Sequence, residues 1–220
     1  IIACLVGSEM CIRDRFQSLA TVAVSGTSIS VADLNDSITQ ANTATTDPTT
    51  TVFSVSSGAT ITTGDEAAFT TLLSNEEAGN IAITDQNLTV SSGTISVDNA
   101  NSLNGTTTGT VTASIDVTES VDTLVTLSGT GAYTIDIRSE DATNSTAAEF
   151  NTINNATTVA IDASEVTALA SSNLSDVKTL LTAANDTDQF TDSTGKVSFG
   201  GLTGVTIADA NVDVSDFNAA

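Results

Sequence analysis

The sequence predicts a mainly β protein, a parallel β-solenoid in which each coil, or rung, carries one short helix. Alternating apolar runs typical of strands recur along the chain, among them VFSV at 52–55 and VTASIDV at 111–117. Helix-like segments return at intervals near those of solenoid repeats. Pro48 is the one proline of the chain, which suits a continuous strand ladder. Tandem β-sandwich domains are the alternative fold, which the repeat interval disfavours.

The stretch from Ile95 to Ile115, ISVDNANSLNGTTTGTVTASI, shows the repeating unit most clearly. It begins as an alternating strand, becomes polar and helix-like through Leu103, turns between Gly105 and Gly109, and restarts as a strand. The expected order within each rung is therefore strand, turn, strand and short helix.

Helix-like segments are expected at five places, and a sixth begins near the end of the chain. They cover residues 31–38, 64–73, 98–104, 146–154 and 173–184, with the sixth starting at Ser215. Each has Asp, Ser, Thr or Asn at or next to its start, as helix capping favours. Most are about two turns long and too short to be stable alone, so they must pack against the strands.

The apolar anchors of these segments measure the repeat. They are Leu34, Phe69, Leu103, Phe150, Leu180 and Phe217, at separations of 35, 34, 47, 30 and 37 residues. The longest gap holds VDTLVTLSGTGA at 121–132, which predicts an extra half-rung with a helix-like turn. Insertions of this kind lie on one edge of a stack of repeats without interrupting it.

Two regions are predicted from composition. Residues 21–220 form the repeat region, a fragment of about five to six rungs truncated at both ends. Residues 1–16 are expected to be a non-native leader, because they hold both cysteines, the only methionine and two of the five basic residues. This segment resembles the adaptor-type leader LVGSEMCIRDR found at the ends of reading frames from environmental sequences. Neither Cys4 nor Cys11 is therefore interpreted as a disulfide or redox site.

The charge balance restricts the classes of partner. The chain has 27 acidic and 5 basic residues, with a net charge of -22. Nucleic acid and anionic membrane surfaces need Lys and Arg to replace counterions, so both are excluded as partners. Cations are the natural partners of such a chain. No run of residues is long and apolar enough to span a membrane.

The sequence predicts no enzyme, and it assigns no catalytic, cofactor-binding or metal-ligating residue. Histidine is absent, both cysteines lie in the leader, and no nucleophile elbow or phosphate-binding loop occurs. Adjacent carboxylates occur at Glu76–Glu77, Asp65–Glu66 and Glu140–Asp141. Two carboxylates can hydrolyse a glycosidic bond, but in so acidic a chain such pairs are usually solvated loops.

One set of acidic residues is a stronger candidate for cation binding. Each follows Ile or Val in a strand-like context: Asp116, Asp136, Asp162 and Asp213. If those strands stack in register, their carboxylates lie roughly 5 Å apart. Two like charges at that distance repel by about 0.8 kcal/mol in bulk water, which favours calcium or high salt. The alternative is that these residues lie on different faces and serve only solubility.

Three quoted units, ISVADLN at 29–35, ISVDNANSLN at 95–104 and AAEFNTINNATTVAIDASEVTAL at 147–169, carry a family resemblance. They resemble the Thr/Asp/Ala-rich repeats of very large bacterial cell-surface and adhesin-like proteins, which often occur with RTX-type modules. The resemblance covers residues 21–220 and rests on style and period. The calcium-binding nonapeptide GGxGxDxUx is absent, so its ligands are not carried over. The resemblance implies an exported, repetitive, non-enzymatic protein.

The leading functional hypothesis is a structural or adhesive segment of an exported surface protein, acting as a spacer or display stalk that contacts neighbouring repeats of its parent protein. Its expected location is extracellular or at the cell surface, and no cofactor is expected. A calcium-dependent folding block of a secreted RTX-like protein is one alternative. A carbohydrate-binding or polysaccharide-acting β-helix is the other, with cell-surface glycans as partners.

Overall fold

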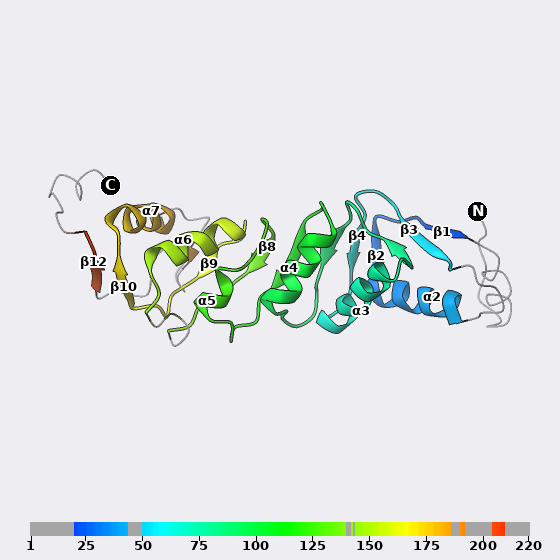
Figure 1. The fold of residues 1–220 in the computed structure, drawn as a ribbon, viewed down its shortest axis with the longest axis horizontal. Helices are drawn as coiled ribbons and strands as arrows, with labels where there is room; N and C mark the ends of the chain where they lie inside the picture. Colours follow the sequence, from blue (N-terminus) through cyan, green and yellow to red (C-terminus); the bar gives the residue numbers. More distant parts are fainter. Residues whose placement is uncertain are drawn as a thin grey trace. The chain divides into compact units, whose positions relative to one another are not determined.

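The computed structural model describes residues 20–43, 50–139, 142, 144–185, 190–191 and 204–209 (Figure 1). The chain divides into two compact units. The first contains residues 1–93 and 105–110, and the second contains residues 94–104 and 111–220. The expected leader, residues 1–16, lies outside the described residues, as does the helix expected from Ser215.

The predicted fold class is wrong, because the described part of the chain is mixed α/β and not mainly β. About 37% of it is helical and 25% is strand, with six helices. The predicted parallel β-solenoid with a short helix per rung therefore gives the helices too small a share. The alternative of β-sandwich domains fails as well, because every described strand pair is parallel and β-sandwiches are antiparallel.

Threonine occurs in several of the helices, although its β-branched side chain favours strands on average. Within the helices, Thr hydroxyls donate to the carbonyl four residues earlier, as Thr70 does to Glu66 at 2.9 Å and Thr152 does to Ala148 at 2.9 Å. This bond lets a helix hold several threonines. Helices α2 and α3, of 13 and 12 residues, are longer than the segments expected at 31–38 and 64–73.

The strands are also shorter than their alternating runs. The run VTASIDV at 111–117 forms a strand of four residues and one further bridge at Ile115. Asp116 then accepts the backbone N–H of Thr118 at 3.0 Å, which turns the chain out of the sheet. Asp162 accepts the backbone N–H of Ser164 in the same way. Asp side chains that bond to the backbone two residues later are typical of turns.

The first unit contains two series of parallel strands and two helices. Its elements are β1 (Thr21–Val24), β2 (Ser28–Ser30), α2 (Val31–Thr43), β3 (Val52–Val55), β4 (Thr60–Thr62), α3 (Glu66–Glu77), β5 (Ile81–Ala82) and β6 (Asn87–Thr89). One series is β1, β3, β5 and the other is β2, β4, β6. The element order strand, strand, helix repeats as expected.

Register in the first unit stacks apolar side chains on one another. Ile29 pairs with Ile61, and Ile61 pairs with Leu88. Phe53 pairs with Ile81 in the other series. A register slip of one residue would turn these side chains to solvent, so their burial holds the strands in place.

The second unit has the remaining helices and strands. Its elements are α4 (Val97–Thr106), β7 (Val111–Ser114), α5 (Val121–Leu124), β8 (Ala132–Thr134), α6 (Ala147–Ala156), β9 (Ile161–Asp162), β10 (Ala168–Ser172), α7 (Leu174–Asn185), β11 (Phe190–Thr191) and β12 (Gly204–Ile207). The last two residues of α4 belong to the first unit. Parallel pairs join β7 to β8, β9 to β11 and β10 to β12.

The predicted helix positions and core anchors are confirmed where the structure describes them. Helices occur at all five predicted places, and the half-rung at 121–132 contains α5. The five described anchors are 0–3% exposed: Leu34, Phe69, Leu103, Phe150 and Leu180. Capping is also as expected, since Asp65 caps α3 and Thr146 with Glu149 forms a capping box on α6.

Asparagine side chains join successive helices. The Asn35 amide of α2 donates to the Ala68 carbonyl of α3 at 2.8 Å, and Asn151 of α6 donates to the Asp176 carbonyl of α7 at 3.0 Å. In α4, Asn101 donates to the Thr126 carbonyl just after α5 at 3.0 Å. Each of these asparagines is the fifth residue of its helix. They tie each helix to the element that follows it through one added hydrogen bond.

Candidate functional site

Three of the four predicted strand aspartates lie in one row of the second unit. Asp136 and Asp162 are direct partners in a parallel bridge. Ser114 pairs with Thr134, and Asp116 and Asp136 each follow two residues after this pair. Neighbouring strands lie about 4.8 Å apart. We call Asp116, Asp136 and Asp162 the carboxylate row; Asp213 lies outside the described residues.

Hydrogen bonds hold two carboxylates of this row at the turns that follow them. Asp116 Oδ1 accepts the Thr118 N–H at 3.0 Å and the Thr118 hydroxyl at 2.9 Å. These bonds, followed by the nearby Arg138 guanidinium, lower the pKa of Asp116 below its usual value. Asp162 Oδ1 accepts the Ser164 N–H at 3.0 Å. The row is partly exposed, with Asp136 the most accessible member.

The carboxylates of the row follow one another along a line and do not surround a common point. Within the described ranges, no three or more His, Cys, Asp or Glu side chains are grouped closely enough to hold a metal ion. A calcium site takes six to eight oxygen ligands around one point, whereas the row spreads its carboxylates along a line. Whether calcium binds there stays a prediction.

Where they are described, the adjacent carboxylate pairs lie at the two ends of α3. Asp65 accepts the Ala68 N–H at 3.0 Å as the N-cap of α3. Glu76 and Glu77 lie in the last turn of the same helix. Glu140 and Asp141 lie outside the described residues. Asp65 therefore has a structural role, and nothing in this geometry pairs the described carboxylates across a substrate.

Sequence reasoning missed a polar clamp in the first unit. The side chain of Gln86 is 1% exposed, and its oxygen accepts the Thr84 N–H at 2.8 Å while its amide donates to the Val55 carbonyl at 3.2 Å. Next to it, the Ser57 hydroxyl donates to Asp85 and lowers the pKa of that carboxyl. A lone Gln in a polar loop carries no sequence signal for such a role, because its carbonyl partners at Val55 and Ser56 lie about 30 residues earlier in the chain.

The aromatic side chains whose burial the structure describes lie in the core. Four aromatic side chains have described burial, and all are 0–2% exposed: Phe53, Phe69, Tyr133 and Phe150. Burial raises the pKa of Tyr133 to about 12, and its hydroxyl has no hydrogen-bond partner among the described residues. A Cβ at Gly131 would lie 2.4 Å from the Tyr133 ring, so this position requires glycine.

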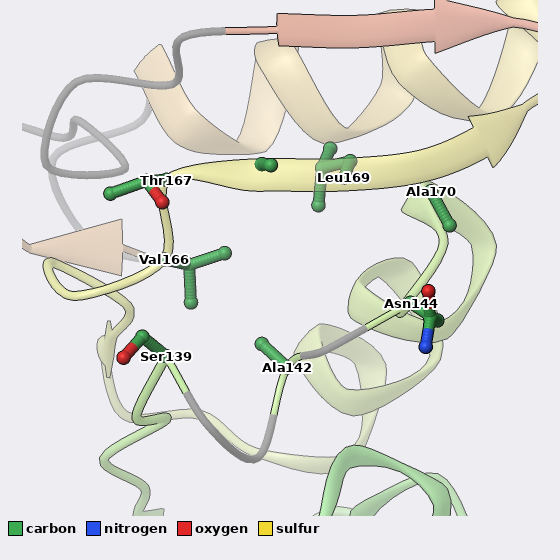
Figure 2. Close-up of a pocket in the computed structure, with 8 residues that line it drawn as sticks. Ser139, Ala142, Asn144, Val166, Thr167, Leu169 and Ala170 are labelled. Carbon is green, nitrogen blue, oxygen red and sulfur yellow. The ribbon is translucent and has the colours of Figure 1, made fainter.

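A pocket of about 350 Å³ lies between β10 and the loop before α6 (Figure 2). Its described lining consists of Ser139, Ala142, Asn144 and residues 166–170. In Figure 2 the side chains of Val166 and Ala142 face the space between the loop and β10. None of these lining residues is acidic, basic or a histidine, so they offer no general acid or base.

The chain matches no protein-family model, no curated protein and no solved structure. Among the helices that the structure describes, none combines the length and the apolar character that crossing a membrane requires.

Proposed function

We propose that this chain is a structural segment of an exported, repetitive surface protein and acts as a spacer or display stalk. The observation that carries the proposal is the bonding between successive repeats. Strands of consecutive repeats pair in parallel, and the fifth residue of α2, α4 and α6 donates to a carbonyl of the following repeat. Contacts made mainly to the next repeat are the signature of arrays that grow by addition.

The distribution of chemical groups supports a structural role. The described aromatic side chains fill the core, and the carboxylates of Asp65, Asp116 and Asp162 cap a helix or close a turn. Polar groups used in this way stabilise local structure. The acidic surface, with a net charge of -22, keeps such a segment soluble and apart from its neighbours.

Export and a cell-surface location belong to the proposal and rest on the resemblance to Thr/Asp/Ala-rich surface repeats. A spacer needs neither catalysis nor a ligand, only a folded length between two attached parts. The property that matters for this role is therefore how constant the distance between the two ends of the segment is.

A distance measurement tests the spacer role. The full chain is placed between two fluorescent proteins and compared with a Gly/Ser linker of the same number of residues by single-molecule energy transfer. We expect a narrow distance distribution for the chain, because a Gly/Ser linker samples a random coil. A distribution as broad as that of the linker would contradict the spacer role.

A second candidate function, a calcium-dependent folding block, has one observation in its favour. Asp136 and Asp162 are placed side by side, so their charges repel and a bound cation would relieve the repulsion. Thermal melts of the full chain by circular dichroism, in chelator and then in millimolar calcium, separate the two functions. A melting temperature that is indifferent to calcium supports the passive spacer, and folding only with calcium supports the second candidate.

A further inference from the structure

The fifth-position asparagines of α2 and α4 use both ends of their side-chain amide groups. Their amide nitrogens donate to a carbonyl of the element that follows. The Asn35 oxygen also accepts the side-chain amide of Asn75 in α3 at 3.2 Å. The Asn101 oxygen accepts the backbone N–H of Ser128 at 2.7 Å and its hydroxyl at 3.0 Å. In these two helices the asparagine therefore donates to the following element and accepts from it.

The corresponding oxygen in α6 has no donor among the described residues. The Asn151 amide donates to the Asp176 carbonyl of α7 at 3.0 Å, whereas Asn151 Oδ1 is buried and unpartnered. In both helix pairs the asparagine bonds to the third residue of the next helix, Ala68 or Asp176. The tenth residues of those helices therefore correspond as well. Asn75 is the tenth residue of α3, and α7 has Ala183 there, which carries no polar side chain.

A second buried oxygen without a donor lies one helical turn later on α6. Asn154 Oδ1 is buried, and none of the described residues donates to it. Residues three apart in sequence are neighbours on one face of a helix. Asn154 therefore lies on the same face of α6 as Asn151, whose amide contacts α7. Two unpartnered acceptor oxygens are thus found together where α6 and α7 pack against each other.

The polar side chains of α7 do not supply the donor. The Thr179 hydroxyl donates to the Ser175 carbonyl at 3.0 Å, and the Thr182 hydroxyl donates to the Lys178 carbonyl at 2.9 Å. Lys178 is the fifth residue of α7, the position from which the other helices bond to the element that follows, so it does not face α6. A buried acceptor that is left unsatisfied costs its full desolvation, and native proteins satisfy nearly all such groups with protein or water.

A water molecule has the chemistry that these oxygens require. It carries two O–H donors, so one molecule can serve both oxygens. Buried waters typically make about three hydrogen bonds to polar groups that are otherwise unsatisfied. A calcium ion fits less well, because it takes six to eight oxygen ligands and this face provides two buried amide oxygens.

We propose that Asn151 Oδ1 and Asn154 Oδ1 bind one buried water molecule between α6 and α7. The water donates to both oxygens and takes the role that the Asn75 amide has between α3 and α2. Water-mediated hydrogen bonds are nearly as favourable as direct ones, so α7 needs no asparagine at its tenth position. This binding site is independent of the proposed function.

Solution NMR of the full chain in water tests the site. Magnetisation transfer from water to the side-chain amide protons of Asn151 and Asn154 detects a long-lived bound water, and the comparison of laboratory-frame with rotating-frame transfer separates it from proton exchange. We expect these cross-peaks at both asparagines of the parent chain.

Two variants should remove the cross-peak at Asn151 by different routes. Ala183→Asn supplies the donor that Asn75 supplies in α3, so the new amide at position 183 should displace the water and contact the Asn151 side chain. Asn154→Leu removes one of the two acceptors and should release the water without adding a donor. Thr182→Asn is the matched control, because it places the same amide at the exposed neighbouring position, and it should leave both cross-peaks unchanged.

Three outcomes would overturn the proposal. The first is a parent chain in which neither asparagine shows a cross-peak to a long-lived water. The second is a cross-peak at Asn151 that persists in Ala183→Asn, which would place the water elsewhere. The third is a shift of the Asn151 amide resonances on adding calcium chloride or potassium chloride at constant ionic strength, in the parent chain but not in Asn154→Leu. That result would assign the site to a cation.

Discussion

The two units present different chemistry on the outward faces of otherwise similar strands. In the first unit the outward positions of β2 and β4 pair hydroxyl with hydroxyl, Ser28 with Thr60 and Ser30 with Thr62. In the second unit the carboxylate row pairs Asp136 with Asp162. Hydroxyl neighbours are compatible in a parallel stack, whereas like charges opposite each other are destabilising. A repeat can therefore vary its outer face while its core and helix contacts stay the same.

Compensation for the repelling charges is local. Thr118 and Ser164 donate to the carboxylates of Asp116 and Asp162, and Arg138 lies near Asp116. The interactions at Asp116 favour its charged form. The cores of the two units should therefore respond alike to substitution, and their outer faces should differ in response to salt.

The largest expected effect comes from the matched core anchors Phe69 and Phe150, in α3 and α6. Each is at most 1% exposed, so Phe69→Ala and Phe150→Ala should each lower the free energy of unfolding by about 3–5 kcal/mol. Urea unfolding measures both values. A difference of more than 2 kcal/mol between them would break the similarity of the cores. Thr152→Ala, an exposed position of α6, is the control.

A smaller effect is expected at the asparagines that join helices. Asn35→Ala and Asn151→Ala each remove one side-chain hydrogen bond to a carbonyl that still accepts within its own helix, which should cost about 0.5–1.5 kcal/mol. Asn35 should cost more, because its oxygen also accepts the Asn75 amide at 3.2 Å, whereas the buried oxygen of Asn151 has no partner among the described residues. Urea unfolding of both variants checks the order, with the exposed Asn155→Ala as control. Equal, negligible losses would show that these bonds do not hold the repeats together.

Removing one charge of the row should stabilise the second unit. Asp162→Asn keeps an oxygen for the Ser164 N–H and ends the repulsion with Asp136, a gain of up to about 1 kcal/mol at low salt. The gain should shrink in 1 M salt, where charges are screened. Thermal melts at two salt concentrations measure it. Asp122→Asn, exposed on α5 and outside the row, is the control, and an equal gain there would show a general charge effect.

The smallest expected effect is on the melting temperature at acidic pH. Because the folded pKa of Asp116 is lowered, its carboxylate contributes stability above the pKa of the unfolded chain, and that contribution is lost as pH falls through the folded value. The window therefore lies below about pH 4. In the first unit, the pKa of Asp85 is lowered as well, mainly by the hydrogen bond from the Ser57 hydroxyl, so its contribution to stability is lost in acid in the same way. Asp116→Asn and Ser57→Ala should each flatten the acid fall of the melting temperature between pH 5 and pH 2. If the melting temperature falls equally in the parent chain and in both variants, these carboxylates do not cause the loss of stability in acid.

From the residue order alone, the positions of the helices and their apolar anchors could be predicted. Capping residues such as Asp65 and Thr146 act on backbone groups within three residues, and Phe69 or Phe150 interrupts a polar segment visibly. Local chemistry of this range is contained in any short window of the chain. The register of Asp136 with Asp162 was a conditional prediction, since it depends on how neighbouring strands align.

Only the tertiary structure decided three things: how much of the chain is helical, what the fifth-position asparagines bond to, and which carboxylates are neighbours. Helix α2 extends to Thr43 and α3 to Glu77, beyond the segments expected at 31–38 and 64–73. Asn35 and Asn151 find their acceptors 33 and 25 residues later in the chain. Helix capping and the spacing of apolar residues act within one repeat, so they can be predicted from the sequence of that repeat. Contacts between repeats depend on the register in which the repeats stack, which no single repeat specifies.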